Sequence, residues 1–321
     1  MTDESDAKPA AQVELDAQVK PGAKHKKSNA LLNVMIAISA IAMIGALGLI
    51  AYPTFSDWWN RMHQSYAVAG YVEQTKDMSG AERKAMLKAA HEYNERLAAN
   101  GDRWHMTDAQ KREYNETLDV TGTGIMGYVT IPRIKVKLPV YHGTSDGVLQ
   151  IAAGHLAGTS LPVGGATTHA VVSGHTGLPS ARLLTGLDEL QKGDTFAFHV
   201  LDETYTYQVD QISVVLPSEI SKLNIESGAD YATLITCTPY GVNSHRLLVR
   251  GHRIPNPKVP DKTQYDEPGE MTAVAAAVIG LLVFVAGCAF VGLARLWRRS
   301  WIVRHGLCAG AGARHSSGVR G

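Results

Sequence analysis

One cysteine in the central part of the chain has neighbours suited to nucleophilic chemistry. Cys237 ends an apolar run typical of a strand, and Arg246 begins the next such run after a turn that contains Pro239. Strands joined by a short turn place these positions at the same end of a hairpin, whereas Arg250 lies about 13 Å further along. A guanidinium beside a thiol favours the thiolate and stabilises an oxyanion. Cys237 and Arg246 therefore predict nucleophilic chemistry by a thiol, with acyl transfer as the reaction.

Such a reaction also needs a proton donor for the leaving amine, and histidine is the usual one. His175 follows the apolar run 170–172, and glycines on both sides let the backbone turn and present the ring at a strand end. Four other histidines lack this setting and are expected at the surface or the edge of the core: His142, His155, His169 and His245. The alternative is a zinc site with the ligands His155, His169, His175 and Cys237. Their spacing matches no familiar zinc motif, so we expect no metal.

Two apolar runs, residues 31–51 and 271–296, are each long enough to cross a hydrocarbon core, which takes about 20 residues. Lysines precede the first run and arginines follow the second. The positive-inside rule then places the tails, residues 1–30 and 297–321, in the cytoplasm and everything between the runs outside. A signal peptide is the competing interpretation of the first run, but its apolar core would be shorter and nearer Met1. We therefore expect a lipid bilayer as a partner.

Composition excludes several other classes of function. The 321 residues include 31 Lys and Arg and 30 Asp and Glu, a net charge of +1 that creates no field to attract nucleic acid. Cys288 lies in the second apolar run and Cys308 beyond it, so the external domain has no internal disulfide. No phosphate loop, dinucleotide fingerprint or calcium loop occurs, and we expect no cofactor.

The external part divides into a helical and a strand-rich region. Within residues 52–123, Ser79 and Glu82 form a capping-box pattern that begins a helix through Leu97, and Thr107 begins another that ends near Leu118. Within residues 124–254 the pattern changes to period two. The expected strands are 126–131, 136–141, 169–173, 195–200, 204–212, 231–237 and 246–250, and the expected short helices are 147–153, 183–190 and 217–223. Seven or eight strands indicate a closed barrel or a sandwich. A proline-rich linker, residues 255–270, leads to the second apolar run.

The motifs around these residues resemble the sortases. They are the run Thr-Leu-Ile-Thr-Cys at 233–237, the arginine nine residues later and the upstream His175. Three stretches resemble the class C, pilus-assembling branch in particular: TCTPYGVNSHRLLVRGHR at 236–253, LPVGG at 161–165 and SGHTGLP at 173–179. The resemblance extends over about residues 60–300.

The resemblance implies a mostly β fold, a closed eight-stranded barrel with short helices, preceded by a helical region and flanked by two transmembrane helices. It implies that Cys237 forms the acyl-thioester, that His175 donates and accepts the proton, and that Arg246 stabilises substrate and oxyanion. Enzymes of this kind cleave a Leu-Pro-x-Thr-Gly-like (LPxTG) signal between Thr and Gly, and class C members pass the acyl group to a pilin lysine. The expected location is the cell membrane of a Gram-positive-type envelope, with the catalytic domain extracellular.

Class C enzymes often carry a lid with an Asp-Pro-aromatic motif before the barrel. The matching place here reads Asp102-Arg103-Trp104, without the proline. The resemblance implies that Asp102 faces Arg246 and that Trp104 covers Cys237. The alternative is that Asp102 only ends a helix and that Trp104 packs on the barrel.

Three other functions remain open. A housekeeping sortase that anchors surface proteins to cell-wall peptidoglycan would use the same residues with a different acceptor amine. A plain thiol peptidase or a cell-wall cysteine transpeptidase needs no arginine paired with the cysteine at this spacing. A non-catalytic scaffold for surface proteins would gain nothing from an exposed thiol.

Overall fold

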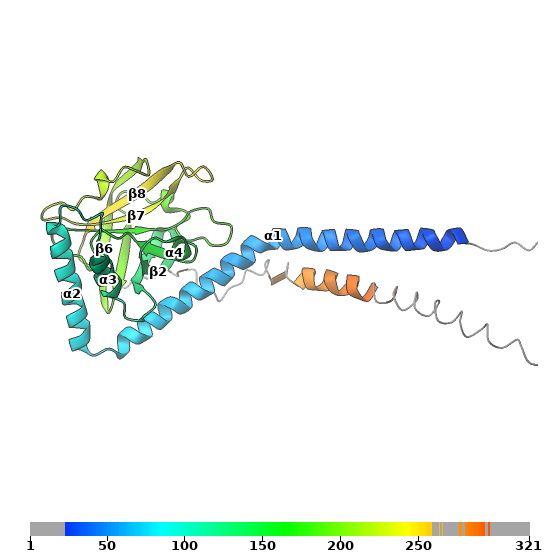
Figure 1. Cartoon of the computed structure of the whole chain (residues 1–321), viewed down its shortest axis with the longest axis horizontal. Coiled ribbons are helices and arrows are strands. Elements are labelled where there is room, and N and C mark those ends of the chain that lie inside the picture. Colours follow the sequence, from blue (N-terminus) through cyan, green and yellow to red (C-terminus); the bar gives the residue numbers. More distant parts are fainter. Residues whose placement is uncertain are drawn as a thin grey trace, which may run out of the picture. The chain divides into compact units, whose positions relative to one another are not determined.

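The computed structural model describes residues 23–258 and, beyond them, 263, 265, 276–277, 280–292 and 295. It divides into two units, one formed by Met1–Gly48 with Leu281–Gly321 and the other by Leu49–Gly280. Helix α1, Ala23–Asp77, contributes to both and continues through Pro53 without a break (Figure 1). The predicted boundary at residue 52, between the first membrane span and the external helical region, therefore lies inside one helix.

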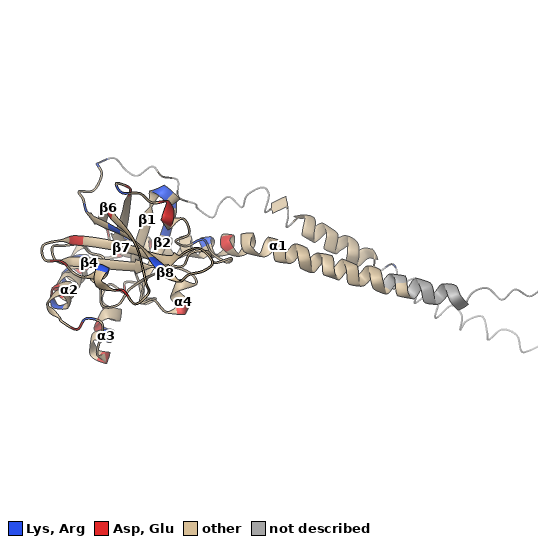
Figure 2. Ribbon diagram, turned by 90° about the horizontal axis from the view of Figure 1, so that it is seen from above, with Lys and Arg blue, Asp and Glu red and all other residues tan. Residues whose placement is uncertain are grey.

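Among the described residues, one helical segment is long and apolar enough to cross a membrane, Val34–Asp77 of α1. Figure 2 shows a long part of α1 without charged residues, as the first predicted span requires. A second apolar helix, Gly280–Gly292, is shorter. The predicted second span, 271–296, lies partly outside the described residues, as do the predicted tails apart from 23–30. The second anchor therefore stays a prediction.

Two short helices connect α1 to the barrel. Helix α2, Gly80–Ala99, begins with the predicted capping box, in which Ser79 accepts from the Glu82 N–H and the Glu82 carboxylate accepts from the Ser79 N–H. Helix α3, Asp108–Glu116, begins in the same way with Thr107 and Gln110. Both predicted helix starts are confirmed, because a capping box is a purely local interaction.

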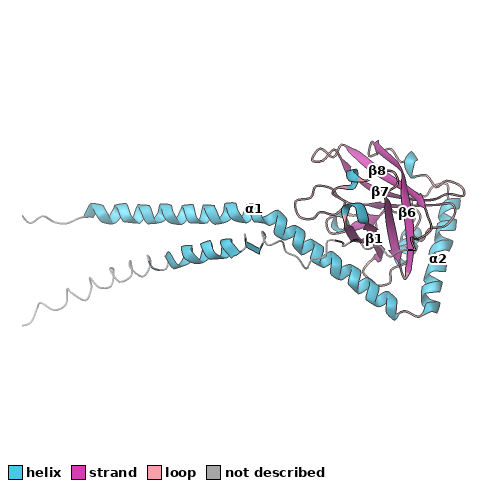
Figure 3. Ribbon diagram, turned by 180° about the vertical axis from the view of Figure 1, so that it is seen from behind, coloured by secondary structure: helices cyan, strands magenta, loops and turns pink. Residues whose placement is uncertain are grey.

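Eight strands form a closed barrel in the order β1-β2-β3-β4-β7-β8-β6-β5. Figure 3 shows the strands in magenta, with β1, β6, β7 and β8 labelled. Their bounds are β1 Ile125–Ile131, β2 Val136–His142, β3 Ala153–His155, β4 Thr168–Ser173, β5 Thr195–Val200, β6 Glu203–Val215, β7 Asp230–Thr238 and β8 His245–Arg253. The barrel and all seven predicted strand segments are confirmed. Strand β3 is the eighth, and its three residues are too few to produce a recognisable alternation.

The predicted short helices are present in shorter form. Helix α4 covers Asp146–Leu149 instead of 147–153, because β3 begins at Ala153. The other two are 3-10 turns, η2 Leu187–Glu189 and η3 Ser221–Leu223, and a third, η1 Pro132–Ile134, joins β1 to β2. Proline and glycine around these turns limit their length.

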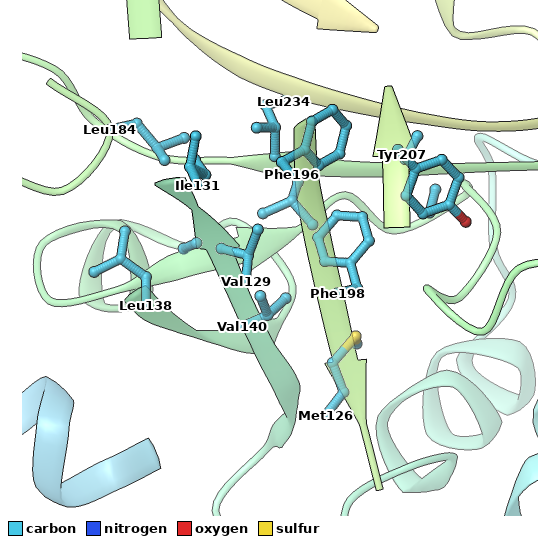
Figure 4. Close-up of a cluster of buried hydrophobic side chains, with 14 of the residues drawn as sticks. Met126, Val129, Ile131, Leu138, Val140, Leu184, Phe196, Phe198, Tyr207 and Leu234 are labelled. Carbon is cyan, nitrogen blue, oxygen red and sulfur yellow. The ribbon is translucent and has the colours of Figure 1, made fainter. Parts of the chain in front are cut away.

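The barrel interior is filled by alternate side chains of its strands (Figure 4). Phe196 and Phe198 of β5 both contact Tyr207 of β6, and their ring centroids lie 5.7 and 6.0 Å from the centroid of the tyrosine ring. Residues of α2 and α3, among them Ala90 and Tyr114, belong to the same buried cluster. The helical region therefore shares the barrel's core.

The second half of α1 also packs on the barrel. Tyr71 is almost fully buried, and its hydroxyl donates to the Met126 carbonyl at 3.1 Å and accepts from the Leu201 N–H at 2.7 Å. Val68, one turn earlier, is buried as well. These contacts lie within the unit Leu49–Gly280 and fix this part of the helix against β1 and the end of β5.

Candidate active site

Strands β7 and β8 form the predicted hairpin. Cys237 and Arg246 are directly opposite each other in its register, which confirms their expected pairing. Arg250 is opposite Thr233, four positions earlier, and its guanidinium makes two hydrogen bonds of 3.0 Å to the Asp210 carboxylate. The register therefore leaves Arg246 as the arginine paired with Cys237.

Strand β4 brings His175 to the same end of the sheet. It runs parallel to β7 with Ser173 opposite Ile235, and the Gly174 N–H continues this ladder to the Ile235 carbonyl at 3.0 Å. The buried Thr236 hydroxyl donates to the Gly174 carbonyl at 2.8 Å. Residue 175 consequently lies level with residue 237. Thr236 was not singled out from the sequence, although it stands in the run that carries Cys237.

The two glycines beside His175 have different tasks. Gly177 has a φ of +72°, and a Cβ there would lie 2.6 Å from the Tyr240 ring, so this position needs glycine for both conformation and space. Gly174 is needed for space alone, because a Cβ would lie 2.8 Å from the Leu184 side chain. The sequence predicts a sharp turn at both glycines, but the turn occurs only at Gly177.

The three candidate residues lie on the outer face of the barrel, where each is half-buried. The Arg246 guanidinium donates to the carbonyls of Asn243 at 3.2 Å and His245 at 3.1 Å, two acceptors of its own loop. In the part of the chain that the structure describes, the His175 ring has no hydrogen-bond partner. A thiol, an imidazole and a guanidinium thus share one solvent-accessible strand end, an arrangement suited to nucleophilic acyl transfer.

An apolar strip continues from this site along the same face. It consists of four buried residues, Val171, Leu223, Ile235 and Leu248, with Trp104, Leu156 and Val215 packed against them. Ile235 precedes Cys237 by two positions and Leu248 follows Arg246 by two, so both share the outward face of the site residues. These four side chains are at most 8% exposed, so the strip is open to a peptide only when the residues packed against it move away.

The lid segment lies against this strip through Trp104. Asp102 is 68% exposed, and its carboxylate is 2.7 Å from the ring of His105. Arg103, which sequence patterns did not mark, is buried and donates to the carbonyls of Gly158 and Leu223 and to the Asn224 side chain. Its guanidinium also lies 4.5 Å from the centre of the Trp104 ring. Burial lowers the pKa of Arg103.

Two other histidines are more deeply buried than the sequence predicts. His155 is fully buried, with one ring nitrogen 2.9 Å from the Tyr114 hydroxyl and the other 2.8 Å from the Ser160 carbonyl. His169 is 1% exposed and contacts the Asn224 carbonyl and the Thr233 hydroxyl through its ring nitrogens. Hydrogen-bond partners on both ring nitrogens permit this burial. Among the described residues, no three His, Cys, Asp or Glu side chains form a metal-binding group.

The chain is similar to known proteins over the barrel and the preceding helices. Residues 129–254 match the sortase domain family. Sortase C1 from Streptococcus agalactiae is 52% identical, with a TM-score of 0.59 over 60% of this chain and 100% of the other. Sortase C from Streptococcus pneumoniae is 45% identical, with a TM-score of 0.54 over 59% and 97%.

Two further comparisons bear on the substrate and on the subfamily. A structure of Clostridium perfringens sortase C with the C-terminal cell wall sorting motif is 40% identical, with a TM-score of 0.53 over 60% of this chain and 99% of the other. Among curated relatives, Sortase A from Streptococcus agalactiae is 29% identical over 117 residues, 36% of this chain and 47% of the relative. This chain thus spans about half the length of that relative. Together, the matching domain, the barrel and the sortase C structures show that this chain belongs to the sortase family, whose members are cysteine transpeptidases.

Proposed function

We propose that this chain is a membrane-anchored class C sortase that polymerises pilins. It cleaves an LPxTG-like sorting signal between Thr and Gly and transfers the acyl group to a lysine of another pilin. The observation that carries the proposal is the direct pairing of Cys237 with Arg246, with His175 level with both. A scaffold without catalysis would not require these three side chains on one exposed strand end.

In the first half-reaction, the Cys237 sulfur attacks the threonine carbonyl carbon of the signal. The carbonyl oxygen becomes an oxyanion, which the Arg246 guanidinium stabilises. The bond to the glycine nitrogen then breaks, and His175 supplies the proton that this amine needs to leave. The product is a thioester between Cys237 and the threonine.

In the second half-reaction, the uncharged amine of a pilin lysine attacks the thioester carbonyl. His175 accepts the proton that the amine loses, and the Cys237 sulfur leaves as a thiolate. The new bond is an isopeptide bond between threonine and lysine. Arg246 stabilises the second oxyanion as it did the first, so one set of groups serves both steps.

The acceptor separates the leading proposal from its nearest alternative. Similarity at 45% identity to the sortase C of Streptococcus pneumoniae, whose structure is described as informative on pilin substrate specificity, supports a pilin acceptor. The curated relatives are two proteins named Sortase A, at 29% and 27% identity, and a cell-wall amine as acceptor stays the alternative. Both reactions use the same thioester.

The lid and the membrane anchor complete the proposal. Residues 102–104 cover the peptide-binding strip in the resting enzyme, which is supported by the contact of Trp104 with the strip. The apolar part of α1 holds the enzyme in the membrane with the barrel outside, and the second apolar run returns the chain to the cytoplasm. The uncharged stretch of α1 supports the first anchor.

Intact-mass measurement of the full chain in detergent micelles tests the proposal. Wild type and Cys237→Ala are mixed with an LPxTG peptide, and then with either a lysine-bearing pilin or a peptidoglycan-type amine. We expect an acyl adduct on wild type alone, followed by transfer to the pilin lysine. Transfer only to the peptidoglycan-type amine would favour the housekeeping alternative. If neither wild type nor Trp104→Ala formed an adduct, the proposed reaction would be wrong.

A further inference from the structure

We infer that Asp57 and Asn60 of helix α1 are positioning residues for His175, which they hold through the connection between β4 and β5. This inference rests on the proposed function, because it concerns the proton transfer assigned to His175. Both residues and the connection belong to the unit Leu49–Gly280. The connection from Gly174 to Leu184 is called the histidine loop below.

The base of the histidine loop is fixed by the barrel. The Leu184 N–H donates to the His175 carbonyl at 3.1 Å, and the Leu184 side chain is fully buried against Gly174. The Gly177 N–H donates to the Thr185 hydroxyl at 3.0 Å. The loop therefore starts and ends at one place, and His175 is part of that closure.

The tip of the histidine loop is fixed by α1. The Asn60 amide donates to the Ser180 carbonyl at 2.7 Å, and the Arg182 N–H donates to the Asp57 carboxylate at 2.8 Å. Asp57 is itself oriented by an ion pair of 3.0 Å with Arg61, one helical turn later. Because Asp57 and Asn60 are three positions apart on a helix, they face the loop together.

The His175 ring obtains no orientation from a side chain among the described residues. A catalytic histidine is usually oriented by a third side chain bonded to its second ring nitrogen. No described residue makes such a bond to His175, so its position depends on its backbone. Proton transfer requires the ring within hydrogen-bond reach of the leaving amine, and a displacement of about 1 Å can cost about a hundred-fold in rate. Fixing the loop at its base and at its tip limits that displacement.

Gln64 provides a matched control on the same helix. Its side-chain amide donates to the Ile151 carbonyl at 2.7 Å, and it is 6% exposed. It thus resembles Asn60 in chemistry and in binding a backbone carbonyl of the barrel unit, but its partner lies outside the histidine loop. A general loosening of α1 would follow from either replacement, whereas misplacement of His175 would follow only from loss of the Asn60 bond.

The test measures transpeptidation by the full chain in detergent micelles, with an LPxTG peptide and a lysine acceptor. We expect Asn60→Ala and Asp57→Ala to lower kcat about ten-fold with KM for the peptide unchanged. Gln64→Ala should keep the wild-type kcat. Asp57→Asn should recover most of the kcat lost in Asp57→Ala, because its amide oxygen still accepts from the Arg182 N–H. Hydrogen exchange over residues 176–183 should accelerate only in the two impaired variants.

Wild-type kcat in Asn60→Ala and Asp57→Ala would overturn the inference, as would an equal loss in Gln64→Ala. An increase in KM with unchanged kcat would also overturn it, since it would assign these residues to peptide binding. An inactive wild type would contradict the proposed function instead. Hydrogen exchange would then still decide whether α1 holds the loop, because equal exchange in all variants contradicts the tether.

Discussion

Two histidines, each at the end of one of two neighbouring strands, differ in burial and in hydrogen bonding. His155, at the end of β3, is fully buried and uses both ring nitrogens in contacts with Tyr114 and Ser160. His175, just beyond β4, is half-buried, and its ring has no hydrogen-bond partner among the described residues. A side chain whose hydrogen-bonding capacity is filled contributes to stability, whereas one with spare capacity is available to a substrate.

The two arginines of β8 show the same contrast. Arg250 makes two hydrogen bonds to Asp210 and lies 4.1 Å from the centre of the Tyr231 ring. Arg246 contacts only carbonyl groups of its own loop among the described residues. Carbonyl contacts leave the charge of a guanidinium uncompensated, so Arg246 can still attract a developing oxyanion.

Replacing each of the two histidines by alanine gives the largest expected effect. His175→Ala should lower kcat for transpeptidation by about a hundred- to ten-thousand-fold, because it removes the proton donor. Its thermal unfolding should match that of wild type. His155→Ala should instead have a lower unfolding temperature, while its folded fraction keeps the wild-type kcat. Measurements of kcat and of the unfolding temperature on both variants check this. A stable His155→Ala with no activity would contradict the division between the two residues.

The second prediction concerns how the free energy of unfolding depends on pH through His155. Burial lowers the pKa of His155 from 6.5 to about 4, so the unfolded state binds a proton at a pH where the folded state does not. The free energy of unfolding should therefore fall as the pH falls from about 6.5 to 4, by about 3 kcal/mol from this residue. Its contribution is fully present above pH 6.5.

Urea unfolding of wild type and His155→Gln at several pH values measures this contribution. The buried His169, whose pKa is also lowered by burial, changes stability in the same direction in both proteins. The difference between wild type and His155→Gln therefore isolates His155. An unchanged slope in His155→Gln would show that this ring is not the group that titrates.

The smallest expected effect concerns the access of a reagent to Cys237 beneath the lid residue Trp104. If the lid is closed in about nine molecules of ten, Trp104→Ala should accelerate alkylation of Cys237 by iodoacetamide about ten-fold. Tyr66→Ala, which removes an exposed aromatic ring of α1, is the control and should leave the rate unchanged. Equal alkylation rates in wild type and Trp104→Ala would favour the alternative that Trp104 only packs on the barrel.

Sequence patterns were sufficient where the responsible interactions are local. The capping-box pattern of Ser79 and Glu82 joins residues three positions apart and predicts the start of α2, and Thr107 marks the start of α3. Alternating apolar residues predict seven strands, and the short turn after Cys237 predicts its pairing with Arg246. Local patterns therefore account for these elements and for the candidate nucleophile with its arginine, whereas the choice of a barrel over a sandwich came from the resemblance to the sortases.

Contacts between residues far apart in the sequence could not be predicted in this way. The burial of His155 depends on Tyr114, 41 positions away, and the histidine loop is bound by Asn60 across 120 positions. The three-residue β3 exists because β2 and β4 provide partners on both sides. Such contacts leave no local periodicity, because their energy comes from groups that are brought together only when the whole barrel closes.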